Sequence, residues 1–528
     1  LLIQLDELIS LINATSVNKR VHRYSCKKCC LWAAFFLPEG KGVWVIYRGF
    51  VVLSLAVLLA ACSVNPVSGE RDFVLMPESE ELALGRQHSR QVMTRYRAYD
   101  NASLQGYIQS VGDRLAAVSH RNTLPYRFTL LDSTEINAFA LPGGYIYITR
   151  GLLAYLNSEA ELAAVLGHEL GHVTARHSVR QHSLSTATQV IGGLMTAASG
   201  VREVSQVSQL LSQGIIKGYG REHELEADGL GVEYLVRAGY PASAMRKVIT
   251  ILKNQELFDQ QLAAEQGRKP RAYHGVFSSH PDNDTRLQEV LSRTVEVPRK
   301  SVGRRQDEVF LKRLVGLTYA DSEQDGVIRG RTFYHAGLDF KLNFPKGWLI
   351  KNTADSVVAI TPSNDAFLQL SMESRPKGLS PRRLLAAKLG QVAVLSEKSL
   401  AVAGRVGHSM LIKGETPYGA GKVRIAVIFD DQRAFLFHAA VKEAAGFSRL
   451  DRRFLASIES FAKLTRADKR LSKPLKIQLT RLGSEVSSLR SAIKRSHIPH
   501  HAEERIKLLN NIFSKGKLKS GDLIKIVR

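Results

Sequence analysis

The sequence contains very little cysteine, and all of it lies at one end. Its four cysteines are Cys26, Cys29, Cys30 and Cys62, within the first 62 of 528 residues. No disulfide can therefore form within the sequence after Cys62, and a metal site there has to use nitrogen and oxygen ligands. The cluster CKKCC has no second cysteine pair to complete a four-ligand zinc knuckle, so we assign it no metal.

The sequence also lacks an apolar run long enough for a comfortable membrane span. Its most apolar stretch, FVVLSLAVLLAA, has the length of a signal-peptide core. Basic Lys41 and Arg48 precede it, and Leu-Ala-Ala-Cys62 ends it, which resembles a bacterial lipobox. We therefore predict that 1–40 is an upstream segment outside the mature protein. We also predict that 41–62 is a lipoprotein signal peptide, with Cys62 as the lipidated residue.

The alternative to this lipobox is an ordinary signal peptide with an incidental cysteine. By resemblance to Gram-negative lipoproteins, Ser63 after the cysteine indicates the periplasmic side of the outer membrane. Acidic residues are scarce as well, at 49 Asp and Glu against 73 Lys and Arg, a net charge of +24. That charge favours membrane head groups, cell-wall polymers or nucleic acid as surroundings. Since no nucleic-acid-binding motif accompanies it, we predict no nucleic-acid partner.

The chemistry of the sequence is concentrated in the stretch SEAELAAVLGHELGHVTARH. Ser158 followed by Glu161 is typical of a helix start, and apolar residues then recur at helical spacing. His168 and His172 stand four residues apart, which places both imidazoles on one side of such a helix. Two imidazoles so placed can bind one cation, and Glu169 can reach a water molecule beside it. This H-E-x-x-H pattern predicts a metallopeptidase with one Zn²⁺ per chain.

A zinc ion held by two histidines needs a third protein ligand and an open position. The stretch GREHELEADGLGVEYLVRAGY predicts a second helix, on which Glu224 and Asp228 share a face. We predict that Glu224 is the third ligand and that Asp228 supports a ligand histidine. Glu222 and Glu226 compete as carboxylates, but we expect them to point elsewhere and to be solvated. His223 is a further alternative ligand, although its charged surroundings favour simple exposure.

Extended strands are predicted before the first of these helices. The segment NAFALPGGYIYITR has a Pro-Gly-Gly turn between two short strands. Asn137, Ala138 and Phe139 form an edge with which a substrate peptide can pair. The alternative is a purely structural hairpin. We expect His177 to lie off the ligand face of the helix, in a structural role, and 183–217 to form helical hairpin material over the site.

HELGH, then 51 residues, then ExxAD, then SSHPDNDTR together resemble the HtpX/Ste24-type zinc metallopeptidases. The likeness is greatest to their periplasmic BepA-like and LoiP-like lipoprotein members, and it covers roughly 62–295. NPVSG after Cys62 is also similar to that group. The resemblance implies a mainly helical, zincin-type (gluzincin) domain with a small sheet. It implies His168, His172 and Glu224 as zinc ligands and Glu169 as the catalytic base.

The same resemblance concerns two residues further on. In relatives, a histidine of a His-Pro pair can cap the open position of the zinc, and His280 with Pro281 matches that place. The alternative for His280 is a loop histidine before a helix. Arg286 matches a family arginine that stabilises substrate charge or pairs with a carboxylate.

Behind the peptidase region, assigned to 63–295, we predict a linker over 296–331. The segments LDFKLNFP, FLQLSM and KVRIAVIF then alternate apolar and polar residues, which predicts a strand-rich α+β accessory domain at 332–462. Residues 463–528 carry 17 Lys and Arg against 5 Asp and Glu. Their strand–helix–helix–strand order resembles a degenerate LysM-like peptidoglycan-binding module at 474–528. The alternative is a basic domain that faces a membrane or a partner.

Together these features predict an α+β chain that acts as a zinc metalloendopeptidase of the bacterial envelope. Its substrates would be misfolded or misassembled envelope proteins, as for its relatives. The competing hypothesis is a non-catalytic, chaperone-like or peptidoglycan-binding lipoprotein on the same fold. The complete set of ligand and base residues favours the enzyme.

Overall fold

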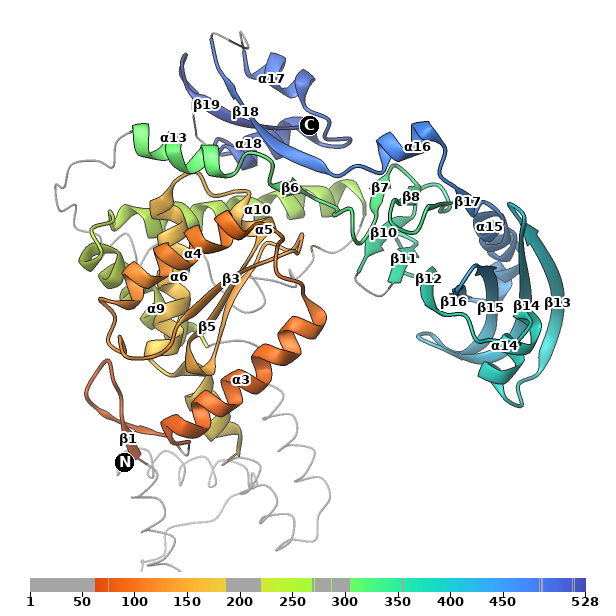
Figure 1. Ribbon diagram of the computed structural model, residues 1–528, viewed down its shortest axis with the longest axis horizontal. Helices are drawn as coiled ribbons and strands as arrows, with labels where there is room; N and C mark the ends of the chain where they lie inside the picture. The colour runs from red at the N-terminus through yellow and green to blue at the C-terminus, as the bar shows by residue number, and fades with distance from the viewer. Residues whose placement is uncertain are drawn as a thin grey trace, which may run out of the picture. The chain divides into compact units, whose positions relative to one another are not determined.

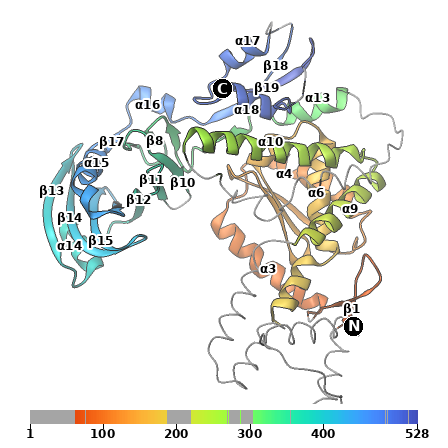
Figure 2. The same cartoon turned by 180° about the vertical axis from the view of Figure 1, so that it is seen from behind.

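The structure of the chain is a computed structural model (Figure 1, and from behind in Figure 2). It describes residues 62–74, 76–186, 220–267, 270, 286, 304–353, 356–483, 485, 488–514, 516 and 518–528. The described residues from Ser63 to Arg528 belong to one compact unit. The predicted upstream segment, nearly all of the signal peptide, most of 183–217 and the His280-Pro281 pair lie outside the described residues.

The peptidase region is built mainly of helices. They are α3 (Glu78–Arg95), α4 (Ala102–Ala116), α5 (Arg150–Leu153), α6 (Glu159–Thr174), α9 (Arg221–Arg237) and α10 (Ser243–Glu265). Helix α6 is the innermost of them, because every residue from Ala160 to Thr174 is buried. It packs against α4, α9 and α10. The Ser158 side chain caps α6 by accepting a hydrogen bond from Glu161 N, as the sequence predicted.

A three-stranded sheet lies beside these helices. Its strands are β3 (Arg127–Leu131), β5 (Tyr145–Thr149) and β4 (Ala138–Leu141), in that spatial order. Strand β3 runs parallel to β5, and β4 runs antiparallel to β5 after the turn η1 (Pro142–Gly144). Strand β4 is therefore an edge strand, and it packs against α6. A separate pair, β1 (Cys62–Val64) and β2 (Arg71–Phe73), forms a hairpin before α3.

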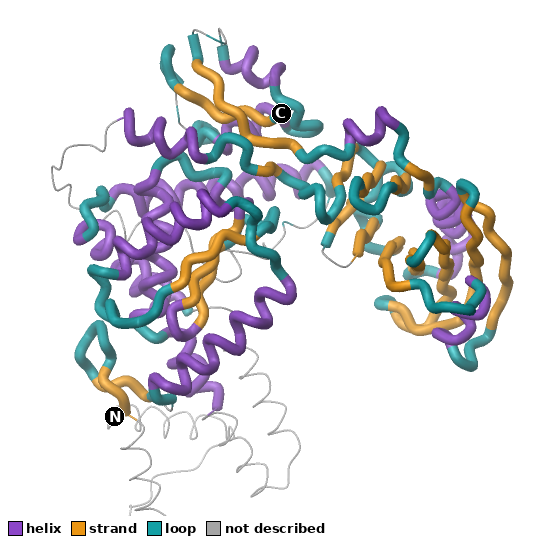
Figure 3. The backbone as a smooth tube through the Cα atoms, viewed as in Figure 1, coloured by secondary structure: helices purple, strands orange, loops and turns teal. Residues whose placement is uncertain are grey.

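The region after the peptidase is rich in strands, drawn in orange in Figure 3. A seven-stranded sheet has the order β10-β11-β12-β16-β15-β14-β13, antiparallel throughout. Its strands are β10 (Leu349–Asn352), β11 (Ser356–Ile360), β12 (Ala366–Ser374), β13 (Val394–Val402), β14 (Arg405–Thr416), β15 (Gly419–Asp430) and β16 (Arg433–Val441). A four-stranded sheet has the order β17 (Ala462–Lys463), β9 (Phe340–Asn343), β8 (Thr332–His335), β7 (Val327–Arg329).

The seven-stranded sheet separates two apolar cores. Along β16, Phe435 and Phe437 contribute to the core that includes α15 (Phe447–Glu459), whereas Ala434 and Leu436 face the core of α14 (Pro381–Leu389). This alternation follows from the two-residue period of a strand. Ser380 before Pro381 is a typical helix start, and its side chain caps α14 by accepting a hydrogen bond from Arg383 N. The expected α+β chain, with a helical peptidase region and a strand-rich C-terminal region, is confirmed.

The last part of the chain forms the predicted strand–helix–helix–strand unit. It follows α16 (Arg466–Leu471) and consists of β18 (Leu475–Arg481), α17 (Leu489–Arg495), α18 (Ala502–Leu509) and β19 (Leu523–Val527). Its sheet gains a third strand, β6 (Thr318–Tyr319), which follows α13 (Arg304–Arg313). Its apolar residues share one core cluster with the peptidase helices. This segment is thus packed as part of the peptidase region, and its LysM-like identity stays a prediction.

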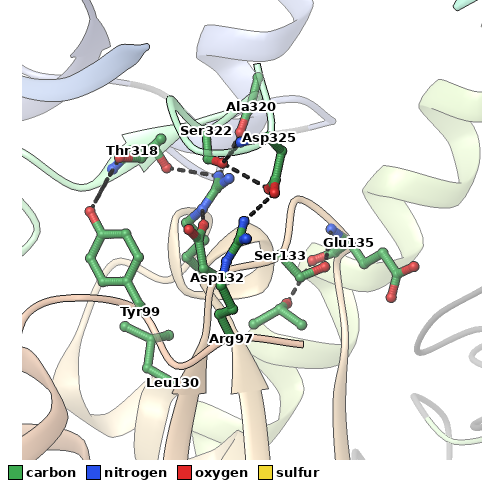
Figure 4. Close-up of polar contacts among 12 residues, drawn as sticks. Arg97, Tyr99, Leu130, Asp132, Ser133, Glu135, Thr318, Ala320, Ser322 and Asp325 are labelled. Atoms are coloured by element: carbon green, nitrogen blue, oxygen red, sulfur yellow. Dashed lines mark hydrogen bonds and ion pairs between the residues drawn. The ribbon is translucent and has the colours of Figure 1, made fainter. Parts of the chain in front are cut away.

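Polar contacts hold the segment around β6 against the peptidase region (Figure 4). Thr318 N donates to Tyr99 Oη at 3.0 Å, and Arg150 Nη1 donates to Thr318 O at 3.1 Å. Arg97 and Asp325 form an ion pair. At least this stretch of the predicted linker is thus fixed in place. Among the described residues, no helix has both the length and the apolarity to cross a membrane.

Candidate metal centre

Two helices supply the predicted ligands, and they approach each other closely. Helices α6 and α9 run side by side (Figure 1). Gly171 makes this possible, because a Cβ there would lie 2.9 Å from Ala227 O. Gly231 does the same from α9, where a Cβ would lie 3.0 Å from His168 N. The small residues therefore bring Glu224, in the first turn of α9, to the histidines of α6.

The three predicted ligands converge on one point. His168 Nε2 and His172 Nε2 are 3.1 Å apart, and each lies 3.5 Å from a Glu224 carboxylate oxygen. The exposed fractions are 6% for His168, 2% for His172 and 0% for Glu224. Two imidazole nitrogens and a carboxylate oxygen that meet in a buried place form a donor set that fits a divalent metal. The site is thus a group of three candidate metal ligands.

Asp228 and Arg286 surround the first ligand histidine. His168 Nδ1 lies 2.8 Å from Asp228 Oδ1, and Arg286 donates to both Asp228 oxygens at 2.8 Å. Arg286 is 3% exposed, and its Nη1 lies 3.3 Å from Glu224 Oε2. The arginine thus pairs with carboxylates of the site, one of the two roles considered from the sequence.

These charges shift the acidities of the site. Burial alone would raise the pKa of Asp228, but Arg286 and His168 lower it to about 2. Burial alone would lower the pKa of His168, but Asp228 and Glu224 raise it to about 9. In the metal-free site His168 therefore holds a proton at neutral pH, and a metal has to displace it.

Glu169 is buried in the α6 turn that carries the ligands, with an exposed fraction of 2%. Its carboxylate is close enough to Arg286 to stabilise the charge of that guanidinium. Asn137 directly precedes the edge strand β4, and Phe139 on β4 stacks on Tyr147 with ring centroids 5.0 Å apart. The edge that sequence reasoning assigned to the substrate is thus the outer strand of its sheet, next to α6. Its role in binding stays a prediction.

His177 lies outside the converging ligand atoms, as the sequence predicted, but it is not on one continuous helix with them. Helix α6 instead ends at Thr174, and Arg176 has a left-handed backbone with φ of 55°. The chain turns there, and His177 Nδ1 comes to 2.8 Å from His172 Nδ1. Hydrogen bonds from Arg176 to Glu81 Oε2 and Met76 O, both at 2.9 Å, compensate the unfavourable φ. No Gly or Pro marks this break, so no local signal predicted it.

Two residues of α9 also differ from expectation. Glu226 was expected to be solvated, but it accepts hydrogen bonds from His177 Nε2 at 3.0 Å and Arg180 Nη1 at 3.1 Å. Although burial opposes its charge, these partners lower the pKa of Glu226 to about 2. His223 is half-buried and stacks on His177 with centroids 4.3 Å apart, outside the converging ligand atoms. Burial and the neighbouring His177 lower its pKa to about 4. Glu222 is exposed, as predicted.

Comparison with known proteins matches this geometry. Residues 102–294, which contain both ligand helices, match the family model of Peptidase family M48. The peptidase region of the chain belongs to peptidase family M48. The HtpX/Ste24-type recognition and the metallopeptidase class predicted from the sequence are thereby confirmed.

Curated relatives support the same family. A beta-barrel assembly-enhancing protease of Yersinia pestis is 28% identical over 68% of this chain and 72% of its own length. The protein of that name in Escherichia coli (strain K12) is 31% identical over 40% of this chain and 44% of its own. Metalloprotease YcaL of Escherichia coli (strain K12) is 28% identical over 34% of this chain and 69% of its own. The chain thus spans less than half of the Escherichia coli assembly-enhancing protease.

Among solved structures, cyanobacterial PsbP from Synechocystis sp. PCC 6803 is 13% identical, with a TM-score of 0.21. That match covers 26% of this chain and 96% of the PsbP chain.

Proposed function

We propose that this chain is a zinc-dependent endopeptidase of the bacterial cell envelope that cleaves misfolded or misassembled envelope proteins. The observation that carries the proposal is the convergence of His168, His172 and Glu224, with Glu169 buried in the same turn. The ligand set on H-E-x-x-H and a following helix is that of gluzincins. The name shared by several relatives, beta-barrel assembly-enhancing protease, supports the envelope substrates.

His168, His172 and Glu224 would hold the zinc ion. When bound, zinc supplies Lewis acidity that polarises a peptide carbonyl and lowers the pKa of water. Glu169 takes the proton from the attacking water and passes it to the leaving amine. Asp228, held by Arg286, keeps the His168 ring oriented with Nε2 toward the metal. A substrate in extended conformation would pair with β4 through the Asn137–Phe139 edge, which places its backbone beside α6.

The proposed location is the periplasmic side of the outer membrane, with a lipid anchor on Cys62. Its support is the lipobox-like Leu-Ala-Ala-Cys62 and the apolar segment before it. The basic segment 474–528 is a candidate for peptidoglycan binding, supported by its charge and element order. The proposed capping of the metal by His280 rests on the His-Pro pair alone.

Zinc content and cleavage of unfolded casein test the enzymatic proposal. We expect the wild-type chain to bind one zinc ion and cleave casein. Glu169→Gln should retain zinc but lose activity by about 10²- to 10⁴-fold, the usual contribution of general acid–base catalysis. Glu222→Gln, on exposed α9 surface, is the matched control and should cleave like wild type. Undiminished cleavage by Glu169→Gln would contradict the assigned base, and a zinc-loaded wild type without cleavage would favour the chaperone-like alternative.

A further inference from the structure

The two ligand histidines have different partners on the ring nitrogen that faces away from the metal position. His168 Nδ1 meets a carboxylate oxygen of Asp228 at 2.8 Å. His172 Nδ1 meets a second imidazole, because His177 Nδ1 lies 2.8 Å from it. His172 and His177 are both buried, at 2% and 0% exposure. A metal-ligating histidine usually donates its other N–H to an acceptor that sets tautomer and ring orientation, and His177 occupies that place for His172.

The hydrogen-bond directions follow from the contact geometry. A His172 ring that binds metal through Nε2 carries its proton on Nδ1, so Nδ1–H donates to His177. His177 Nδ1 must then be the acceptor, which leaves the proton of a neutral His177 on Nε2. That Nε2 lies 3.0 Å from Glu226 Oε2, and the carboxylate accepts the bond. The carboxylate of Glu226 thus determines the tautomer of His177, and His177 in turn determines the tautomer of His172.

Glu226 is itself held in place from outside the site. Arg180 Nη1 donates to Glu226 Oε2 at 3.1 Å, while Arg180 Nε lies 3.4 Å from Asp72 Oδ2. Asp72 accepts from Asn65 Nδ2 at 2.8 Å. Asn65 begins the NPVSG turn, where its Oδ1 accepts from Val67 N at 2.8 Å. The turn that the sequence singled out without a function therefore lies at the outer end of a chain of polar contacts that reaches a metal ligand.

We propose that His177 and Glu226 are positioning residues of the metal centre, holding His172 with Nε2 toward the metal. The hairpin Asn65–Asp72 anchors this pair through Arg180. The inference rests on the proposed metal-dependent function. Arg180, Glu226 and Asp72 have side-chain exposures of 25%, 30% and 22%, so solvent screens the outer contacts more than the inner one. The effect of substitutions should therefore decrease from His177 outward.

Zinc affinity of the full chain, measured without substrate by competition with a fluorescent chelator, tests the proposal. We expect His177→Phe to weaken zinc binding by about 10- to 100-fold, the usual effect of losing such a partner. Glu226→Ala should weaken it about 10-fold, and Asp72→Asn by less than about 5-fold. His177→Gln should recover most of the affinity, because an amide can accept from His172 and donate to Glu226. Glu222→Ala, on the same helix, is the control and should remain within about two-fold.

A second readout separates positioning from packing. In the cobalt-substituted protein, the visible absorption bands should shift in His177→Phe and stay unchanged in Glu222→Ala. If His177→Phe does not fold, Glu226→Ala decides, since that side chain is partly exposed. Zinc affinity within two-fold of wild type in Glu226→Ala and in any folded His177→Phe would overturn the proposal. So would a His177→Gln variant that binds zinc no better than His177→Phe. Failure of the proposed peptidase function appears separately, as a wild type that binds zinc and cleaves nothing.

Discussion

Zinc binding is predicted to strengthen steeply with pH, because the metal competes with a proton on His168. Asp228 and Glu224 overcome the effect of burial and raise the pKa of His168 to about 9 in the metal-free site. Below that pKa, the apparent zinc affinity should fall about ten-fold for each pH unit. From pH 7 to 8.5 the affinity should therefore rise by about 20-fold, whereas a histidine of ordinary pKa would give less than about two-fold.

The assay is zinc competition against a chelator of known affinity at several pH values, corrected for protonation of the chelator. Asp228→Asn removes the carboxylate that contributes most to raising the pKa of His168. The zinc affinity of this variant should therefore stop rising at a lower pH than the affinity of the wild type. Glu222→Gln, which lies outside the site, should follow the wild-type curve. A wild-type affinity that does not change above pH 7 would refute the reasoning.

The same pKa shift has a consequence for the stability of the metal-free protein. A histidine whose folded-state pKa is raised contributes stability that is complete below its unfolded pKa of 6.5 and is lost as pH rises through 9. The difference corresponds to about 3 kcal/mol in the free energy of unfolding. Asp228, with a pKa of about 2, stays ionised in this range and does not contribute to the slope. Urea unfolding of metal-free protein at pH 6 and pH 9.5 should show the loss.

Two further predictions concern packing. Gly171→Ala should lower the melting temperature and the zinc affinity, because its Cβ would lie 2.9 Å from Ala227 O and separate α6 from α9. Gly106 lies on α4, and no atom is within 4 Å of a Cβ added there, so Gly106→Ala should instead stabilise the folded protein by about 0.5–1 kcal/mol. Equal effects of the two substitutions on the melting temperature would refute this account. Lys525 is fully buried and donates to Ala154 O and Leu156 O at 2.6 and 2.8 Å. Lys525→Met should therefore cost about 2–3 kcal/mol of stability in denaturant unfolding, whereas exposed Lys519→Met should change it by less than about 0.5 kcal/mol.

The sequence by itself determined the inner part of the site. His168 and His172 share a face because an α-helix returns to the same side every four residues, and nothing distant can change that spacing. The choice of Glu224 over Glu222 followed from the same geometry, and the structure brings it to the histidines. A similar reason explains why the sequence indicates the Ser158 cap, the start of α14 at Ser380 and the alternating strands of the accessory region. Each depends on neighbours within a few residues along the chain.

Only the tertiary structure decided what surrounds that inner part. His177 reaches His172 because the helix breaks at Arg176, and the hydrogen bonds that stabilise the break come from Glu81 and Met76, far away in sequence. Glu226 is a partner of His177 rather than a solvated carboxylate because α6 and α9 pack closely at their glycines. Lys525 and the C-terminal strands join the peptidase core for the same kind of reason. The local sequence pattern predicts helices and strands from their periods. Which side chains from distant segments become partners depends on packing, burial and charge in the folded chain.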